Sequence, residues 1–175
     1  MKALVRWQHP ERGLLPPSAF LAEIEQSALI GPLTYWVMHR ALLDCAEWMR
    51  AAVNWTVAVN VSVRNLEKDS FREEVLELLA ATGVPAYQLQ LEVTETALTA
   101  DATLLAASVA QLATDGVTVA IDDFGEGYTN LSLLRLLRVG EVKIDRSFVS
   151  RLATSGEDRA SSPRSSTWRR RWAGA

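Results

Sequence analysis

Cysteine and histidine are scarce in this 175-residue chain, which has one cysteine, Cys45, and two histidines, His9 and His39. One thiol can form neither an internal disulfide nor a zinc cluster of several thiolates, which fits a reducing compartment. The two histidines share no metal-ligand spacing. No stretch approaches the roughly 20 apolar residues of a membrane-spanning helix, and no basic segment followed by an apolar core opens the chain. We therefore expect a cytoplasmic protein without a membrane segment.

Charge is unevenly distributed along the chain. Hydrophobic residues make up 49% and charged residues 22%, a composition that excludes disorder throughout. Residues 1–152 carry a net charge of −6, whereas residues 153–175 carry +3 and are rich in Arg, Ser and Trp. This last segment sustains no helical or strand period, and its arginines form no helical stripe. We expect a folded region over 1–152 and a disordered tail over 153–175 that binds no nucleic acid.

Strand and helix patterns alternate within the first region. Short β-branched runs ending in polar residues predict strands at 55–60, 89–93, 117–123 and 142–145. Amphipathic patterns predict helices at 32–49, 70–81, 101–115 and 130–137, the second with a capping box formed by Ser70 and Glu73. Strands that alternate with helices favour an α/β fold with a parallel sheet. Periodicity alone leaves a barrel and a doubly wound sheet both open.

Four tryptophans, Trp7, Trp36, Trp48 and Trp55, lie in this region. Large aromatic side chains bury much of their surface in folded proteins. We expect these residues to pack in the core or between helices.

Polar side chains gather where the predicted strands end: Asn60, Glu92, Asp122 and Asp123, with Lys143 inside the last strand. The carboxyl ends of parallel strands meet at one edge of a sheet, where active-site groups converge. Carboxylate and amide oxygens suit Mg²⁺ or Mn²⁺, and such ions support hydrolysis or phosphoryl transfer. A scaffold whose loops are merely acidic is the alternative, since an aspartate at a strand end often caps a helix or forms a turn.

These motifs, taken in order, resemble the EAL family of bacterial cyclic di-GMP phosphodiesterases. The matching segments are ALVRWQHPERGLLPPSAF at 3–20, NVSVRNL at 60–66, LEVTET at 91–96, IDDFGEGYTNLSLL at 121–134 and VKIDRSFV at 142–149. The resemblance implies a TIM-type (β/α) barrel that takes part in second-messenger signalling. It also implies hydrolysis of cyclic di-GMP to pGpG with two Mg²⁺ or Mn²⁺ ions.

The resemblance further implies roles for individual residues. It makes Asn60, Glu92, Asp122 and Asp123 the metal ligands. It assigns to Lys143 the positioning of the attacking water and to Arg6 a contact with a substrate phosphate. Arg6 and Leu4 both match positions of the family's E-A-L-x-R signature. Glu95 is expected to steady the loop at 124–130, through which a homodimer would form.

Lys2 departs from the family pattern, because a glutamate that ligates metal should stand before Ala3 and Leu4. An ammonium offers no lone pair and repels a divalent cation at contact range. We expect metal affinity to fall severely.

Family segments before residue 1 and after residue 152 are also missing, so we expect an incomplete EAL domain truncated at both ends. About five of the eight strands of the barrel would remain, with two unpaired edges. Three interpretations follow: a phosphodiesterase domain that is catalytically defective, a non-catalytic domain that senses cyclic di-GMP or binds a protein, and a gene fragment without independent function.

Overall fold

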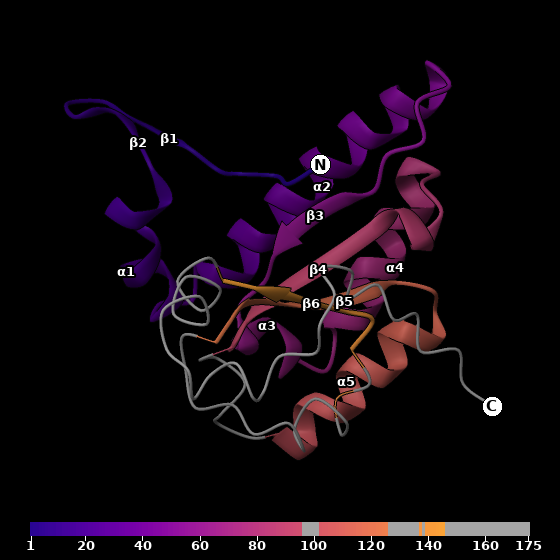
Figure 1. Cartoon of the computed structure of the whole chain (residues 1–175). Coiled ribbons are helices and arrows are strands. Elements are labelled where there is room, and N and C mark those ends of the chain that lie inside the picture. Colours follow the sequence, from indigo (N-terminus) through magenta and orange to yellow (C-terminus); the bar gives the residue numbers. More distant parts are fainter. Residues whose placement is uncertain (96–101, 126–136, 138, 146–175) are drawn as a thin grey trace, which may run out of the picture.

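A computed structural model of the chain describes residues 1–95, 102–125, 137 and 139–145. Its centre is a parallel sheet in the order β3-β4-β5-β6 (Figure 1). The strands are β3 (Val57–Asn60), β4 (Leu89–Thr94), β5 (Thr118–Phe124) and β6 (Glu141–Ile144). All four predicted strands are thus present. The parallel α/β fold is confirmed, and the sheet corresponds to part of a TIM-type barrel.

The chain before the hairpin extends this sheet beyond β3. Lys2 forms a parallel bridge with Ala58. The Ala3 amide donates to the Ala58 carbonyl at 2.8 Å, and the Ala58 amide donates to the Met1 carbonyl at 2.7 Å. Residues 1–3 therefore lie alongside β3 as a short fifth extended segment, in keeping with the expected number of strands.

Side chains on the two faces of the sheet differ in character. In β4, Leu89, Leu91 and Val93 belong to the hydrophobic core, whereas Gln90 and Glu92 alternate with them. The same period of two holds along the other strands, because successive side chains of a strand point to opposite faces. One face of the sheet is therefore apolar, and the other carries the polar side chains.

Helices cover the apolar face. The longer ones are α2 (Ile30–Arg50), α4 (Phe71–Thr82) and α5 (Ala102–Thr114), and the short α3 (Val63–Leu66) contacts all three. Figure 1 shows α2, α4 and α5 along one side of the sheet. Leu105, Val109 and Leu112 recur at helical spacing on α5, and all are buried in the core. None of the described helices is long and apolar enough to cross a membrane.

Helix α4 ends as predicted but begins differently. Gly83 terminates it with a left-handed φ of 69°, which glycine adopts without strain. The predicted capping box is wrong, because the Ser70 side chain makes no cap hydrogen bond. Instead, the Ser70 hydroxyl donates to Glu74 Oε1 at 2.9 Å, and Lys68 pairs with the same carboxylate. The remaining predicted helix, at 130–137, lies outside the described residues except for Leu137.

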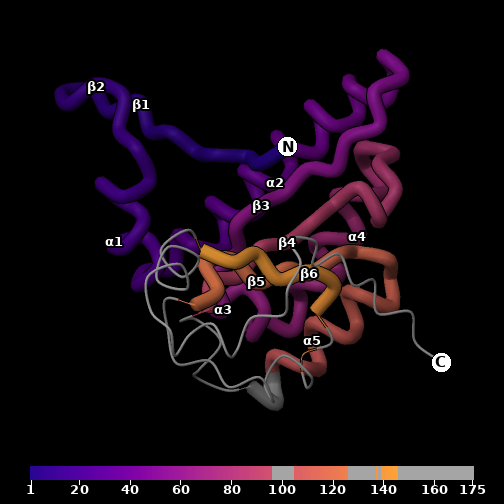
Figure 2. The backbone as a smooth tube through the Cα atoms, viewed as in Figure 1, coloured from indigo at the N-terminus to yellow at the C-terminus, as the bar shows by residue number. Residues whose placement is uncertain are grey.

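An arm precedes α2 and projects from the sheet (Figures 1 and 2). It consists of the antiparallel hairpin β1 (Trp7–His9) and β2 (Gly13–Leu15), the 3₁₀ turn η1 (Pro17–Ala19) and the short helix α1 (Leu21–Glu25). A second 3₁₀ turn, η2 (Ala86–Gln88), leads into β4. The arm brings its apolar residues beside the carboxyl ends of the strands.

The expectation for the tryptophans is wrong for three of the four. Trp36 is 58% exposed on α2, Trp55 is 50% exposed before β3, and Trp7 lies exposed on the arm. Only Trp48 is partly buried against the core, with its ring 5.6 Å from that of Trp55. Helix α2 turns a different set of side chains toward the sheet, so the Trp36 ring faces outward.

Candidate functional site

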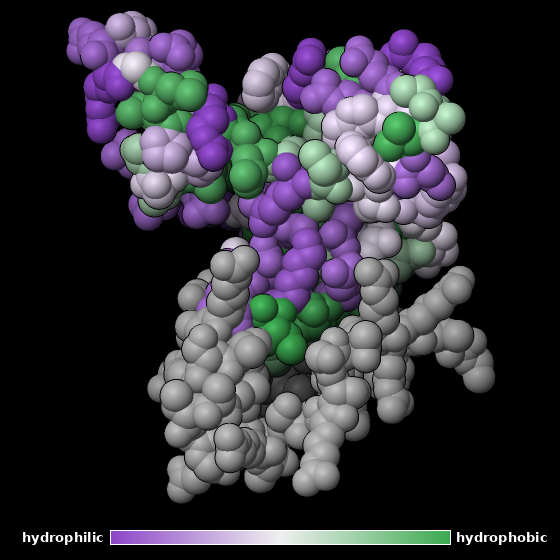
Figure 3. Space-filling model, turned by 45° about the horizontal axis from the view of Figure 1, so that its top comes forward, coloured by the Kyte–Doolittle hydropathy of each residue, from purple (hydrophilic) through white to green (hydrophobic). Residues whose placement is uncertain are grey.

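A cavity of about 440 Å³ opens at the carboxyl ends of the strands. Its polar lining includes Lys2, Asn60, Glu92, Asp122 and Asp123. Its apolar wall comes from the N-terminal segment, the arm and α2, and includes Leu4, Pro17, Leu21, Ile30, Leu33 and Val37. On the face drawn in Figure 3, hydrophilic residues gather across the middle of the molecule. The predicted convergence of strand-end side chains is therefore present, in a pocket that is polar on one side and apolar on the other.

The sheet places these side chains by register. Asn60 is the last residue of β3 and pairs with Glu92 of β4. Asp122 pairs with Thr94 on the other side of β4. The pairing of β5 with β6 then shifts between Ile121 and Phe124, so β5 contains an extra residue at the two aspartates. Such a bulge bends a strand locally and redirects its side chains.

Asp123 has a left-handed backbone, with φ of 55°. Aspartate tolerates this region better than most residues. Gly125 follows with φ of 105°, a conformation that favours glycine. The strained turn at the end of β5 lets both Asp122 and Asp123 line the cavity.

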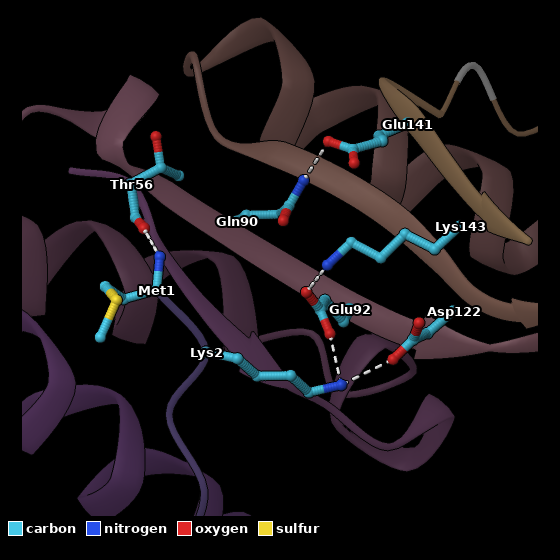
Figure 4. A network of polar contacts seen from close by, with 8 residues as sticks. All are labelled: Met1, Lys2, Thr56, Gln90, Glu92, Asp122, Glu141 and Lys143. Atoms are coloured by element: carbon cyan, nitrogen blue, oxygen red, sulfur yellow. Dashed lines mark hydrogen bonds and ion pairs between the residues drawn. The ribbon is translucent and has the colours of Figure 1, made fainter. Parts of the chain in front are cut away.

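The Lys2 ammonium lies between two carboxylates (Figure 4). Lys2 Nζ donates to Asp122 Oδ2 at 2.6 Å and lies 2.7 Å from Glu92 Oε2. Lys143 reaches from β6 and donates to the other oxygen of Glu92. The Glu92 side chain is fully buried, whereas 34% of the Lys2 side chain is exposed. A buried carboxylate is thus held between two lysines that reach it from opposite edges of the sheet, on the same polar face.

Charge and burial set the pKa values in this cluster. Burial lowers the pKa of Lys2, but hydrogen bonds and attraction from Asp122 and Glu92 outweigh it and raise the pKa overall. Burial raises the pKa of Asp122, and Lys2 outweighs it, so that the pKa is lowered. Burial and repulsion from Asp122 raise the pKa of Asp123. The Lys2–Asp122 pair is therefore ionised at neutral pH, whereas Asp123 takes up a proton more readily than an ordinary aspartate.

The oxygen atoms at this edge of the sheet include one that could bind a divalent ion. Glu92 Oε2 is buried and, among the described residues, receives no hydrogen bond of good geometry, although it forms the ion pair with Lys2. Such an oxygen suits a cation. That position is taken by the Lys2 ammonium, however, and the described part of the chain contains no group of three or more His, Cys, Asp or Glu arranged to hold a metal. With Lys2 in this place, the residues do not fit a divalent ion.

The other predicted site residues are more dispersed. Leu4 lines the cavity, whereas Arg6 is not among the lining residues and donates to the neighbouring Val5 carbonyl at 2.8 Å. Glu95 Oε2 accepts a hydrogen bond from the Gly125 amide at 2.6 Å. This contact links the end of β4 to the turn after β5. Residues 126–130 of the predicted dimer loop lie outside the described residues.

Sequence reasoning missed two features of the site. It treated Lys2 as a cation that repels metal, without foreseeing its pairing with both Glu92 and Asp122. It also missed the apolar wall, because the arm and α2 follow a local pattern that says nothing about where they pack. A signal for the pairing of Lys2 was available in the sequence: Lys2 directly precedes Ala3, the first residue of a segment that matches the family.

Comparisons with known proteins agree with one another. A family model described as "EAL domain" matches residues 1–163. A cyclic di-GMP phosphodiesterase of Pseudomonas aeruginosa is 36% identical over 155 residues, which are 89% of this chain and 26% of the relative. An uncharacterised protein of Mycobacterium tuberculosis is 40% identical over 159 residues, 90% of this chain and 26% of the relative. The chain thus spans about a quarter of the length of these relatives.

Solved structures show the same similarity. A structure described as "PaMucR Phosphodiesterase, c-di-GMP complex" has a TM-score of 0.80 and 36% identity, covering 91% of this chain and 65% of the other. The EAL enzyme Bd1971, in a form bound to cAMP and cyclic di-GMP, has a TM-score of 0.79 and 28% identity, covering 91% and 45% respectively.

Proposed function

Because the chain belongs to the EAL domain family, we propose that it is a cyclic di-GMP phosphodiesterase domain of second-messenger signalling in which hydrolysis is impaired. One observation carries the impairment: the Lys2 ammonium lies between Glu92 and Asp122, at 2.7 and 2.6 Å. An ammonium has no vacant coordination position for a water or a phosphate oxygen. The acidic edge of the sheet therefore lacks the electrophile that metal-dependent hydrolysis requires.

The cavity supports the choice of ligand. Its apolar wall offers surface to a planar base, and its polar edge lies where the strands end, which is the usual position of ligands in parallel β/α folds. A relative that is 36% identical is named as a cyclic di-GMP phosphodiesterase. A solved structure with the same identity is described as a complex with this nucleotide.

The proposed roles follow the resemblance residue by residue. We assign Asn60, Glu92, Asp122 and Asp123 to the positions at which the family binds Mg²⁺ or Mn²⁺, and the support is that all four line one cavity. In this chain, the Lys2 ammonium lies between two of them and takes the place of an ion. Lys143 is assigned to the reacting water, and the support is its contact with Glu92.

Leu4 and Arg6 are assigned to the nucleotide, which for Arg6 requires its side chain to turn from Val5 toward the cavity. Glu95 is assigned to the turn after β5, supported by its bond to Gly125. We further propose a cytoplasmic location. We also propose a homodimer through the loop at 124–130, and light scattering of the purified chain tests whether this dimer forms.

A turnover assay tests the impairment. The purified chain is incubated with cyclic di-GMP and Mn²⁺, and pGpG is followed by chromatography. We expect no pGpG above the level of the Glu92→Gln variant, which lacks one carboxylate of the site. Turnover by the unmodified chain that Glu92→Gln abolishes would refute the impairment and leave an active phosphodiesterase.

A non-catalytic sensor or protein-interaction domain is the second candidate, favoured because the cavity and its apolar wall do not depend on a metal. Calorimetric titration with cyclic di-GMP distinguishes it, in Ca²⁺ and again in EDTA. Micromolar binding in both solutions, without turnover, identifies a sensor. Absence of binding in both solutions contradicts any role in cyclic di-GMP signalling for this chain alone.

A further inference from the structure

The backbone fixes the position of Lys2, which distinguishes it from an ordinary surface lysine. The parallel bridge to Ala58 and the hydrogen bonds of Met1 and Ala3 to Ala58 hold residues 1–3 along β3. Ala3 packs against the core. Since successive side chains of an extended segment point to opposite faces, Lys2 faces the polar side of the sheet.

The charges around the ammonium explain why it stays there. Three carboxylates line this part of the cavity, those of Glu92, Asp122 and Asp123. Two lysines oppose them, Lys2 from the N-terminal segment and Lys143 from β6 (Figure 4). Without Lys2, the fully buried Glu92 carboxylate would keep only Lys143, and Asp122 would lose the ammonium that lies 2.6 Å from it. Removing a partner from a buried carboxylate and from a partly buried neighbour is costly, so the cluster needs a cation at this point.

We infer that Lys2 is a tethered cation: its ammonium fills the position between Glu92 and Asp122, excludes divalent ions, and leaves a divalent-cation site when its charge is removed. The buried Glu92 Oε2, which receives no well-formed hydrogen bond from the described residues, marks the point at which the ion would bind. The inference rests on the proposed function for the assignment of these carboxylates. It does not depend on cyclic di-GMP binding or on turnover.

Mn²⁺ binding without nucleotide tests this inference, measured by electron paramagnetic resonance of free Mn²⁺ and by calorimetry. Lys2→Met removes the charge and keeps the apolar stem. Lys2→Gln replaces the ammonium with an amide oxygen that can itself ligate. We expect both variants to bind Mn²⁺ at least about tenfold more tightly than the unmodified chain, a difference of ~1.4 kcal/mol. Lys68→Met, which removes an exposed lysine paired with Glu74, should bind like the unmodified chain.

Two results would overturn the inference. One is Mn²⁺ binding by the unmodified chain as tight as that of the variants. The other is folded Lys2 variants that bind no Mn²⁺ more tightly than Lys68→Met does. If both variants fold only when Mn²⁺ is added, the inference is supported, since the ion then replaces the ammonium. If neither folds even with Mn²⁺, the unmodified chain decides: Mn²⁺ binding that is lost in Glu92→Gln contradicts the inference, and absence of binding supports it.

Discussion

Removing the Lys2 charge should lower the free energy of unfolding. The exposure of the paired side chains and the second partner of Glu92 limit the size of this loss. Breaking a buried ion pair by deleting one partner costs about 3–5 kcal/mol, because the other charge stays buried without compensation. Here, 34% of the Lys2 side chain and 16% of the Asp122 side chain are exposed, and Glu92 keeps Lys143. Solvent screening and the remaining partner reduce the cost. We expect Lys2→Met to lower the free energy of unfolding by about 1–3 kcal/mol at neutral pH in EDTA.

Urea denaturation followed by tryptophan fluorescence measures this loss. Lys68→Met is the matched control, because it removes the same functional group from an ion pair in which 51% of the lysine side chain is exposed. Exposed pairs contribute at most about 1 kcal/mol. A Lys2→Met loss no larger than the control's would show that the ammonium does not compensate a buried charge.

The dependence on pH separates electrostatic compensation from lost packing. In the unmodified chain, the pKa of Asp122 is lowered, chiefly because Lys2 outweighs the effect of burial. A carboxyl whose folded-state pKa is lowered stabilises the fold above its unfolded pKa of about 3.9 and loses that contribution as pH falls through the folded pKa. Lys2→Met removes the ammonium that opposes the effect of burial on Asp122, so we expect the pKa of Asp122 to rise and acidification to remove less stability at this residue. The difference between the two chains should therefore shrink from neutral pH toward about pH 3. A difference that stays constant would assign the loss to packing and refute the electrostatic argument.

Three further outcomes are expected elsewhere. Leu42→Ala should lower the free energy of unfolding by about 2–5 kcal/mol in the same urea assay, because Leu42 is fully buried in the core. Glu95→Leu should cost about 1–3 kcal/mol, because it leaves the Gly125 amide without the acceptor now at 2.6 Å; a smaller loss would mean that water replaces that acceptor. The Cys45 thiol should react with an aromatic disulfide reagent only as fast as the chain opens, since it is fully buried and burial raises its pKa; rapid reaction in the absence of denaturant would contradict this.

Local signals account for most of what the sequence predicted correctly. The strands combine β-branched runs with polar ends, and their parallel pairing follows from the helices between them. Once the strands are parallel, their carboxyl ends lie at one edge, which is why Asn60, Glu92 and Asp122 converge as predicted. This step needs only the order of the elements, and no knowledge of how side chains pack.

Predictions that depended on competition between neighbours were less successful. Glu73 stands three residues after Ser70, as a capping box requires. The Ser70 hydroxyl nevertheless donates to Glu74, with which Lys68 also forms an ion pair. Trp36 is apolar and lies on a helix that packs on the core. Only one face of helix α2 is buried, however, and Trp36 lies on the exposed face. In both cases the residue type permitted two environments, and the geometry of the surrounding residues decided between them.

The effect of Lys2 depends on its exact position in the strand, which the amino-acid composition does not reveal. The family pattern, in which a metal-ligating glutamate stands at this position, predicted weaker metal binding from the lysine that replaces it. It did not predict which carboxylates the ammonium would pair with. The effect of the lysine depends on strand parity: Ala3, one position later, packs against the core, whereas residue 2 faces the carboxylates. The pairing with Ala58 then sets how far the ammonium reaches, which brings Nζ within hydrogen-bond distance of Asp122 and beside Glu92. The same charge on the other face of this segment would disturb the core and leave the acidic edge uncompensated, so the parity of residue 2 makes Lys2 a partner of the carboxylates.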